Sequence, residues 1–423
     1  MKIVHNLTNL LDDPDFIANH RQRPQDFTRQ RHLTFKNLVL FLLNQPQSAL
    51  QTELDRFFQV LHQSPIEQPS ITPQALSLAR RKLKPSVFEA LNQALQQQLD
   101  ALGLRRTWRG LRLLAIDGSA VHLPLEPGLE RFFGQHHELP MARLSMLYDV
   151  LNEQALHSLL VPLDVGERGC AQLHLDQAPP HSLILFDRGY PAQWLFALLQ
   201  QQACQFVMRL PTGYNPEVEA FLQSGQAERD VTFQARHWDS RLACDEVGVD
   251  AKARIRLRLV RVELPTGEVE VLATSLLDAD CFPATEFKDL YHRRWGIETD
   301  YRRQKQTLRL ENFSGRTVTA VKQDVLATQL LRNLALLMMH LEQPRIDREQ
   351  AHRKLRWRAN VTQGVSRLKD TLVQLFVRPG IDLMAALLAL LRRGLSAIRP
   401  GRRFPRKRRR QATRGCEGYK RTR

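Results

Sequence analysis

The sequence contains few cysteines, and their placement is not that of structural residues. The five among 423 residues form an odd, scattered set: Cys170, Cys204, Cys244, Cys281 and Cys416. There is no C-x-x-C pair and no Cys/His cluster with the spacing of a zinc site. The sequence therefore indicates neither a disulfide framework nor a structural zinc centre, and a reducing compartment is expected.

Long apolar runs are also lacking. The N-terminus, MKIVHNLTNLLDDPDF, has no apolar segment like that of a signal peptide. The stretches ATQLLRNLALLMMHL and DLMAALLALLRRG contain or end in arginine. Neither reaches the roughly 18 uninterrupted apolar residues of a membrane span. No membrane-embedded segment is expected.

Acidic residues are too few to balance the basic ones. The chain has 61 Lys and Arg against 44 Asp and Glu, a formal net charge of +17. Between Arg402 and Arg423 eleven basic residues accompany a single acid, Glu417, so this tail supplies +10 and leaves +7 for the preceding residues. Nucleic acid and an anionic membrane surface are the candidate partners. Because the rest of the chain is basic too, we favour a tail that contacts phosphates over a disordered tail that only increases solubility.

The spacing of apolar residues changes along the chain and divides it into parts that together predict an α/β fold. Hydrophobic residues make up 43% of the chain, enough for a sizeable core. Helical spacing dominates the two ends, while short apolar runs with interposed helices fill the centre. We expect a helical DNA-contacting domain (1–105), a core in two parts (106–204 and 284–345) separated by a mainly β insert (205–283), a helical C-terminal region (346–401) and a basic tail (402–423).

Three basic residues end a short helix in the N-terminal part. Thr72 and Pro73 are typical of a helix start, and this helix should end before Pro85. The basic residues at its end, Arg80, Arg81 and Lys82, could contact DNA. A helical bundle with a solvated basic face explains them equally well.

Two carboxylates end short apolar runs that read as strands. Asp117 closes LRLLAID, and Asp187 closes LILFD. An acid at the end of a buried strand is costly unless it is paired, hydrogen-bonded or holds a cation. A capping aspartate at a turn explains either residue taken alone.

A third acid belongs to a longer pattern. Tyr291, Arg294, Glu298 and Lys305 have the spacing Y-x2-R-x3-E-x6-K. On one continuous helix these side chains would lie within an arc of about 60°. Ordinary charge pairs, such as Arg294 with Glu298, would also explain the charges.

With these residues the chain resembles the DDE transposases of the insertion-sequence-four group, whose third acid lies in this motif. AIDGS and FDRGY resemble the surroundings of the first two acids, and DFTRQRHLTFKNLVLFLLN and ARRKLKPSVFEALN resemble the family's N-terminal part. The resemblance implies a ribonuclease H-like core with a mainly β insert between the second and third acids. It also implies a bacterial, cytoplasmic and nucleoid-associated enzyme.

The resemblance assigns roles to these residues. Asp117, Asp187 and Glu298 would be catalytic and would bind two Mg²⁺ ions per site, with Mn²⁺ able to substitute. Arg294 and Lys305 would hold phosphates of the transposon end, and the hydroxyl of Tyr291 would position one. The partners would be double-stranded DNA, as element ends and target, and a second copy of the chain in the DNA complex.

The implied activity is cut-and-paste transposition: binding of the terminal inverted repeats, strand cleavage and strand transfer. Characterised relatives pass through a hairpin on the excised end, assisted by a tryptophan of the insert that stacks on a displaced base. Trp238 is the tryptophan within the expected insert, although packing in a small β core is the simpler explanation for it. The alternatives are a transposase-derived DNA-binding regulator without catalysis and a ribonuclease H-like nuclease that cuts without joining.

Overall fold

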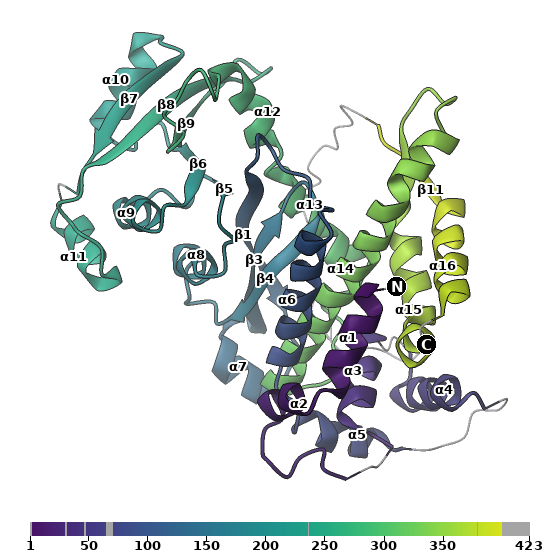
Figure 1. Cartoon of the computed structure of the whole chain (residues 1–423). Coiled ribbons are helices and arrows are strands. Elements are labelled where there is room, and N and C mark those ends of the chain that lie inside the picture. Colours follow the sequence, from purple (N-terminus) through teal and green to yellow (C-terminus); the bar gives the residue numbers. More distant parts are fainter. Residues whose placement is uncertain are drawn as a thin grey trace. The chain divides into compact units, whose positions relative to one another are not determined.

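A computed structural model describes residues 2–29, 32–45, 48–64, 71–235, 237–378 and 380–399. The protein is mixed α/β and divides into two compact units (Figure 1). Unit 1 is built from the described residues of 1–104, 120–142 and 303–399, and unit 2 consists of 105–119 and 143–302. The basic tail from Arg402 lies outside the described residues. None of the helices in the described ranges is long and apolar enough to cross a membrane.

Unit 1 is helical, and the two ends of the chain share its core. Its helices are α1 (Lys2–Asp12), α2 (Pro14–His20), α3 (Phe35–Leu43), α4 (Leu50–His62), α5 (Pro73–Arg80), α6 (Ser86–Ala101), α7 (Pro127–Phe133), α14 (Val318–Glu349), α15 (Val361–Val377) and α16 (Ile381–Arg393). Helix α14 contacts α3, α6, α15 and α16, and Figure 1 shows it running beside α15. The side chains of Leu38, Leu95, Leu330 and Leu372 belong to one apolar cluster. The two helical regions, expected as separate domains, therefore pack around one core.

Short strands complete unit 1. Strand β2 (Gln135–His136) pairs with the start of β3 (Leu139–Asp149), and β10 (Trp357–Ala359) pairs antiparallel with β11 (Leu395–Ala397). As expected, Thr72 caps α5: its hydroxyl accepts a hydrogen bond from the backbone N–H of Ala75 at 3.2 Å.

Unit 2 is organised around a sheet with helices. The strands are β1 (Arg112–His122), β3, β4 (Gln154–Val161), β5 (Ser182–Phe186), β6 (Gln205–Leu210), β7 (Glu228–Phe233), β8 (Ile255–Glu263) and β9 (Val269–Thr274), in the spatial order β3-β1-β5-β6-β9-β8-β7 with β4 on β3. Strands β1, β5 and β6 are parallel. All five residues of β5 are buried, as expected for a central parallel strand covered on both faces.

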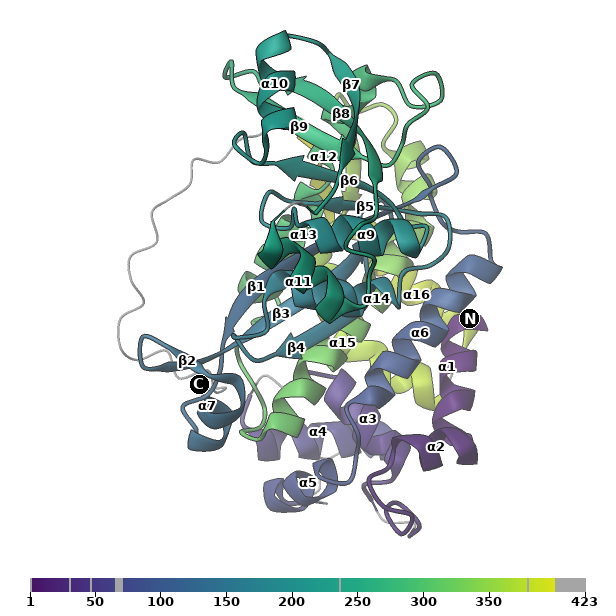
Figure 2. The same ribbon diagram turned by 90° about the vertical axis from the view of Figure 1, so that its left-hand side faces the viewer.

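The helices of unit 2 follow the strands along the chain. They are α8 (Glu167–Leu175), α9 (Gln193–Gln201), α10 (Pro216–Ser224), α11 (Trp238–Val247), the 3₁₀ turn Ala284–Glu286, α12 (Phe287–His292) and α13 (Trp295–Gln306), the last of which continues into unit 1. Helices α9 and α11 lie side by side (Figure 2).

The expected β insert extends the central sheet. Its first strand, β6, pairs in parallel with β5, with Phe206 opposite Ile184. Strands β9, β8 and β7 then add in antiparallel order. Residues 205–283 also contain helices α10 and α11, so the segment is less purely β than its sequence indicated.

Candidate active site

Asp187 directly follows β5, as the sequence predicted. Its Oδ1 accepts a hydrogen bond from the backbone N–H of Gly189 at 2.7 Å, which fixes the carboxylate over the turn. The hydroxyl of Tyr291 donates to the carbonyl oxygen of Phe186 at 3.1 Å. Helix α12 thereby anchors the end of the strand that presents Asp187.

Asp117 does not close its strand, contrary to expectation. Strand β1 continues to His122. Its fully buried run ends at Ile116, and in the segment that follows Ala120 is exposed and Val121 is buried. This second half has no continuous apolar run to reveal it in the sequence. Tyr301 of α13 donates its hydroxyl to the carbonyl oxygen of Asp117 at 2.7 Å, a contact that the sequence did not indicate.

The environment of Asp117 favours its protonated form. Burial is the largest cause, and it raises the pKa of the carboxyl to about 7. Arg294 and a 2.8 Å hydrogen bond from the N–H of Gly118 lower the pKa, while the charges of Asp187 and Glu298 raise it. The charges of the other two motif acids, Asp187 and Glu298, therefore both reach Asp117.

The Y-R-E-K motif does not lie on one continuous helix, so that expectation was wrong. Tyr291 lies in α12, Glu298 and Lys305 lie in α13, and Arg294 lies in the turn between the two helices. Gly296 lies in the first turn of α13, directly after the break. A Cβ atom at Gly296 would lie 3.3 Å from Cγ1 of Val150, which is a tight contact.

The break places the guanidinium of Arg294 between two of the acids. Its Nη2 donates to Glu298 at 2.7 Å, and Nη1 lies 3.6 Å from Oδ2 of Asp117. The side chain is 7% exposed and lies against the rings of Tyr291 and Trp295. Within the described part of the chain, its Nε and Nη1 have no hydrogen-bond partner. Arg294 therefore retains buried donors that a phosphate oxygen could accept.

The acids have the chemistry of a divalent-metal site but are not gathered as ready ligands. Across the described residues, no group of three or more His, Cys, Asp or Glu side chains could hold a metal ion as it stands. The guanidinium of Arg294 is the cation between Asp117 and Glu298. Carboxylate oxygens are nevertheless the ligands that Mg²⁺ prefers, and burial, followed by the charges of Asp187 and Glu298, raises the pKa of Asp117.

Lys305 belongs to unit 1, where its ammonium group donates to the carbonyl oxygen of Ala120 and lies 3.8 Å from Oε1 of Glu311. The hydroxyl of Tyr291 donates a hydrogen bond to the carbonyl oxygen of Phe186. Phosphate contacts by these two side chains remain predictions.

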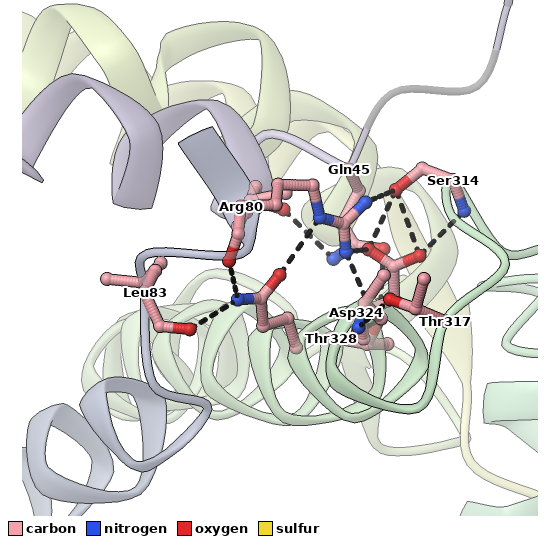
Figure 3. Close-up of polar contacts among 10 residues, drawn as sticks. Gln45, Arg80, Leu83, Ser314, Thr317, Asp324 and Thr328 are labelled. Atoms are coloured by element: carbon pink, nitrogen blue, oxygen red, sulfur yellow. Dashed lines mark hydrogen bonds and ion pairs between the residues drawn. The ribbon is translucent and has the colours of Figure 1, made fainter. Parts of the chain in front are cut away.

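Arg80 lies at the centre of a buried polar network (Figure 3). Its side chain is 5% exposed and forms an ion pair with Asp324 at 2.9 Å. Further hydrogen bonds run to Gln323 at 2.9 Å, Ser314 at 2.8 Å and the carbonyl oxygen of Ala320 at 2.7 Å. The structure thus gives Arg80 a role in joining α5 to α14, and nothing in this arrangement supports the expected DNA contact.

The two basic residues that follow Arg80 have a different environment. Arg81 and Lys82 are exposed at the end of α5. A phosphate contact by these two side chains therefore remains a prediction.

Trp238 is exposed, so the simpler expectation that it packs in a β core was wrong. It is the first residue of α11, and 73% of its surface is accessible. Its neighbours His237 and Asp239 line a pocket of about 640 Å³, together with Arg168, Trp194 and others. An exposed indole is free to stack, which keeps base stacking as a prediction.

Removing the carboxylate of Asp117 should stabilise the metal-free protein at alkaline pH. A carboxyl whose pKa is about 7 in the folded chain and about 4 in the unfolded chain costs stability as pH rises between these values. Asp117→Asn should therefore gain on the order of 2 kcal/mol over the original chain at pH 8, but not at pH 4. Unfolding in EDTA at both pH values tests this, with the exposed Asp245→Asn as control. An equal difference at both pH values would contradict it.

A comparison with known protein families matches the part of the chain that carries these acids. The model of the transposase DDE domain family matches residues 108–334, a segment that includes all three acids and more than half of the chain. The chain therefore belongs to the family of DDE transposases.

Individual relatives support the IS4 type within this family. The chain is 24% identical over 350 residues to the transposase InsG for insertion sequence element IS4 of Escherichia coli (strain K12), covering 79% of this chain and 76% of that protein. It is 28% identical over 188 residues to the putative transposase InsZ of the same organism, covering 43% of this chain and 62% of InsZ. Among solved structures, the piggyBac transposase synaptic complex with hairpin DNA matches with a TM-score of 0.45 and 11% identity, covering 92% of this chain and 85% of the other.

Proposed function

We propose that this chain binds the terminal inverted repeats of its own insertion sequence and moves the element by metal-dependent cleavage and strand transfer of DNA. The observation that carries the proposal is the convergence of Asp117, Glu298 and Arg294, with the charge of Asp187 acting on Asp117. A ribonuclease H-like core, with β1 and β5 supplying the first two acids, is part of the proposal.

The acids would hold the metal, and Mg²⁺ is the proposed ion. Two such ions held there would supply activation of a water or 3′-OH nucleophile and neutralisation of charge on the leaving 3′ oxygen. The chain itself supplies Asp117, Asp187 and Glu298 as oxygen ligands, Tyr291 and Tyr301 as anchors of the two strands, and Arg294 as a donor to phosphate. No side chain need act as nucleophile.

In unit 1, the exposed Arg81 and Lys82 and the ammonium group of Lys305 would contact DNA phosphates. In unit 2, Arg294 would be a phosphate donor. Trp238 would stack on a displaced base if the excised end passes through a hairpin. A homodimer in the DNA complex would allow both element ends to be processed together.

A supercoiled donor plasmid carrying the element's own ends tests the function. Purified chain with Mg²⁺ should release the element and join it to target DNA. Cleavage without strand-transfer products would favour the nuclease alternative. End binding without cleavage would favour the regulator.

Removing the tail from Arg402 should weaken DNA binding without changing which ends are preferred. The tail supplies +10 of the net charge, and affinity that does not depend on sequence comes from neutralising phosphates. The plot of log Kd against log salt should therefore become shallower in the truncated chain. Binding to the element end and to an unrelated duplex at several salt concentrations measures this, and an unchanged slope would contradict it.

A further inference from the structure

The carboxylate of Glu167 lies between the segments that carry Asp117 and Asp187. Glu167 is the first residue of α8. A Cβ atom added to Gly118 would lie 3.3 Å from its Oε1, and one added to Gly189 would lie 3.6 Å from its Oε2. These glycines follow Asp117 by one position and Asp187 by two. One carboxylate therefore reaches both segments, and the absence of side chains on the glycines leaves room for it.

A buried hydroxyl, that of Tyr190, lies within electrostatic reach of the same acids. Tyr190 is 0% exposed, and within the described ranges its hydroxyl has no hydrogen-bond partner. Burial raises the pKa of this phenol well above its usual value, and the charges of Asp117, Glu167 and Asp187 raise it further. The hydroxyl therefore stays protonated and can donate. A buried donor without an acceptor costs about 1–3 kcal/mol, which points to an acceptor outside the chain.

A salt bridge explains only part of this arrangement. Nη1 of Arg143 lies 3.0 Å from Oε1 of Glu167, and the side chain of Glu167 is 38% exposed. Ion pairs at this exposure contribute about 0–1 kcal/mol. The pair accounts neither for the position of Glu167 beside both glycines nor for the unused hydroxyl of Tyr190.

We infer that Glu167 is a fourth carboxylate of the active site and helps to hold a divalent cation beside Asp117 and Asp187, with Tyr190 donating to a water bound there. This inference rests on the proposed metal-dependent function. Loss of a group that supports metal ligands typically lowers metal affinity by about 10–100-fold. Arg143, by contrast, places a positive charge against the same carboxylate and opposes binding of a cation.

Binding of Mn²⁺ to the full-length chain without DNA tests the inference, with free Mn²⁺ measured by electron paramagnetic resonance. Glu167→Gln should raise the Kd at least about tenfold. Glu246→Gln, an exposed substitution on α11, should leave the Kd unchanged. Arg143→Gln separates the two explanations. It should tighten binding if Glu167 serves the cation, whereas a purely structural salt bridge predicts that Arg143→Gln and Glu167→Gln weaken binding alike.

The binding results distinguish failure of the inference about Glu167 from failure of the proposed metal-dependent function. A folded original chain that binds no Mn²⁺ at millimolar concentration would overturn both. Binding by the original chain with an unchanged Kd in Glu167→Gln would overturn the role of Glu167 alone. If Glu167→Gln fails to fold, Glu167→Asp and Arg143→Gln decide. The shorter acid should then weaken binding and the arginine variant strengthen it, and the reverse result would overturn the inference.

Discussion

Glu298→Gln should abolish Mg²⁺-dependent nicking of a DNA fragment carrying the element's end, while binding to that fragment persists. Glutamine keeps the shape and one acceptor oxygen but loses the charge that attracts a metal ion. The loss of activity should exceed the about 10–100-fold that follows removal of a group supporting a metal ligand. A gel-shift assay beside a nicking assay measures both properties on the same preparation.

Two further variants show whether the effect is specific to Glu298. Glu219→Gln makes the same chemical change at an exposed position of α10 and should nick normally. Arg294→Ala removes the guanidinium that lies 2.7 Å from Glu298, and it should weaken end binding as well as nicking. Normal nicking by Glu298→Gln would refute its role as a metal ligand, and with it most of the proposed mechanism.

Arg80→Ala should destabilise unit 1 by about 3–5 kcal/mol, since it leaves the carboxylate of Asp324 buried without its cation. It also removes the hydrogen bonds of Arg80 to Gln323, Ser314 and Ala320. Urea denaturation, followed by the fluorescence of an added probe on unit 1, measures the change. A loss below about 1 kcal/mol would mean that the network contributes little to stability.

The neighbouring arginine is a matched control. Arg81 is exposed, so Arg81→Ala should change stability by less than about 0.5 kcal/mol. If its side chain contacts phosphate, the same variant should weaken DNA binding. The double substitution of Arg80 by Met and Asp324 by Asn removes both charges together, and it should recover part of the stability lost in Arg80→Ala.

The comparison of Arg80 with Arg81 shows what sequence reasoning could not supply. Both belong to one basic cluster in the sequence, yet one is buried and its neighbour is exposed. The partner of Arg80 is Asp324, 244 positions away, and no local pattern indicates that pairing. The first half of β1, strand β5 and the start of α5 were predictable because each depends on a local pattern of residues.

The active-site acids show the same limit of sequence reasoning, which is that contacts between distant residues are not visible in local patterns. The short apolar runs identified β1 and β5, and the spacing of the Y-R-E-K motif identified Glu298 as the third acid. The motif did not reveal the break at Arg294 between α12 and α13. Glu167 belongs to no motif, and its nearness to Asp117 and Asp187 arises only when α8 packs in the folded chain.

The shared core of unit 1 also determines when this unit can fold during synthesis at the ribosome. Its apolar cluster draws on residues from Ile3 to Leu99 and again from Leu326 to Leu391. The first helices to emerge therefore wait, with their apolar faces uncovered, until more than two hundred further residues have been synthesised. Chaperone binding to nascent chains should be concentrated on that interval. A copy of the gene interrupted before α14 should yield an insoluble fragment rather than a DNA-binding competitor of the intact protein.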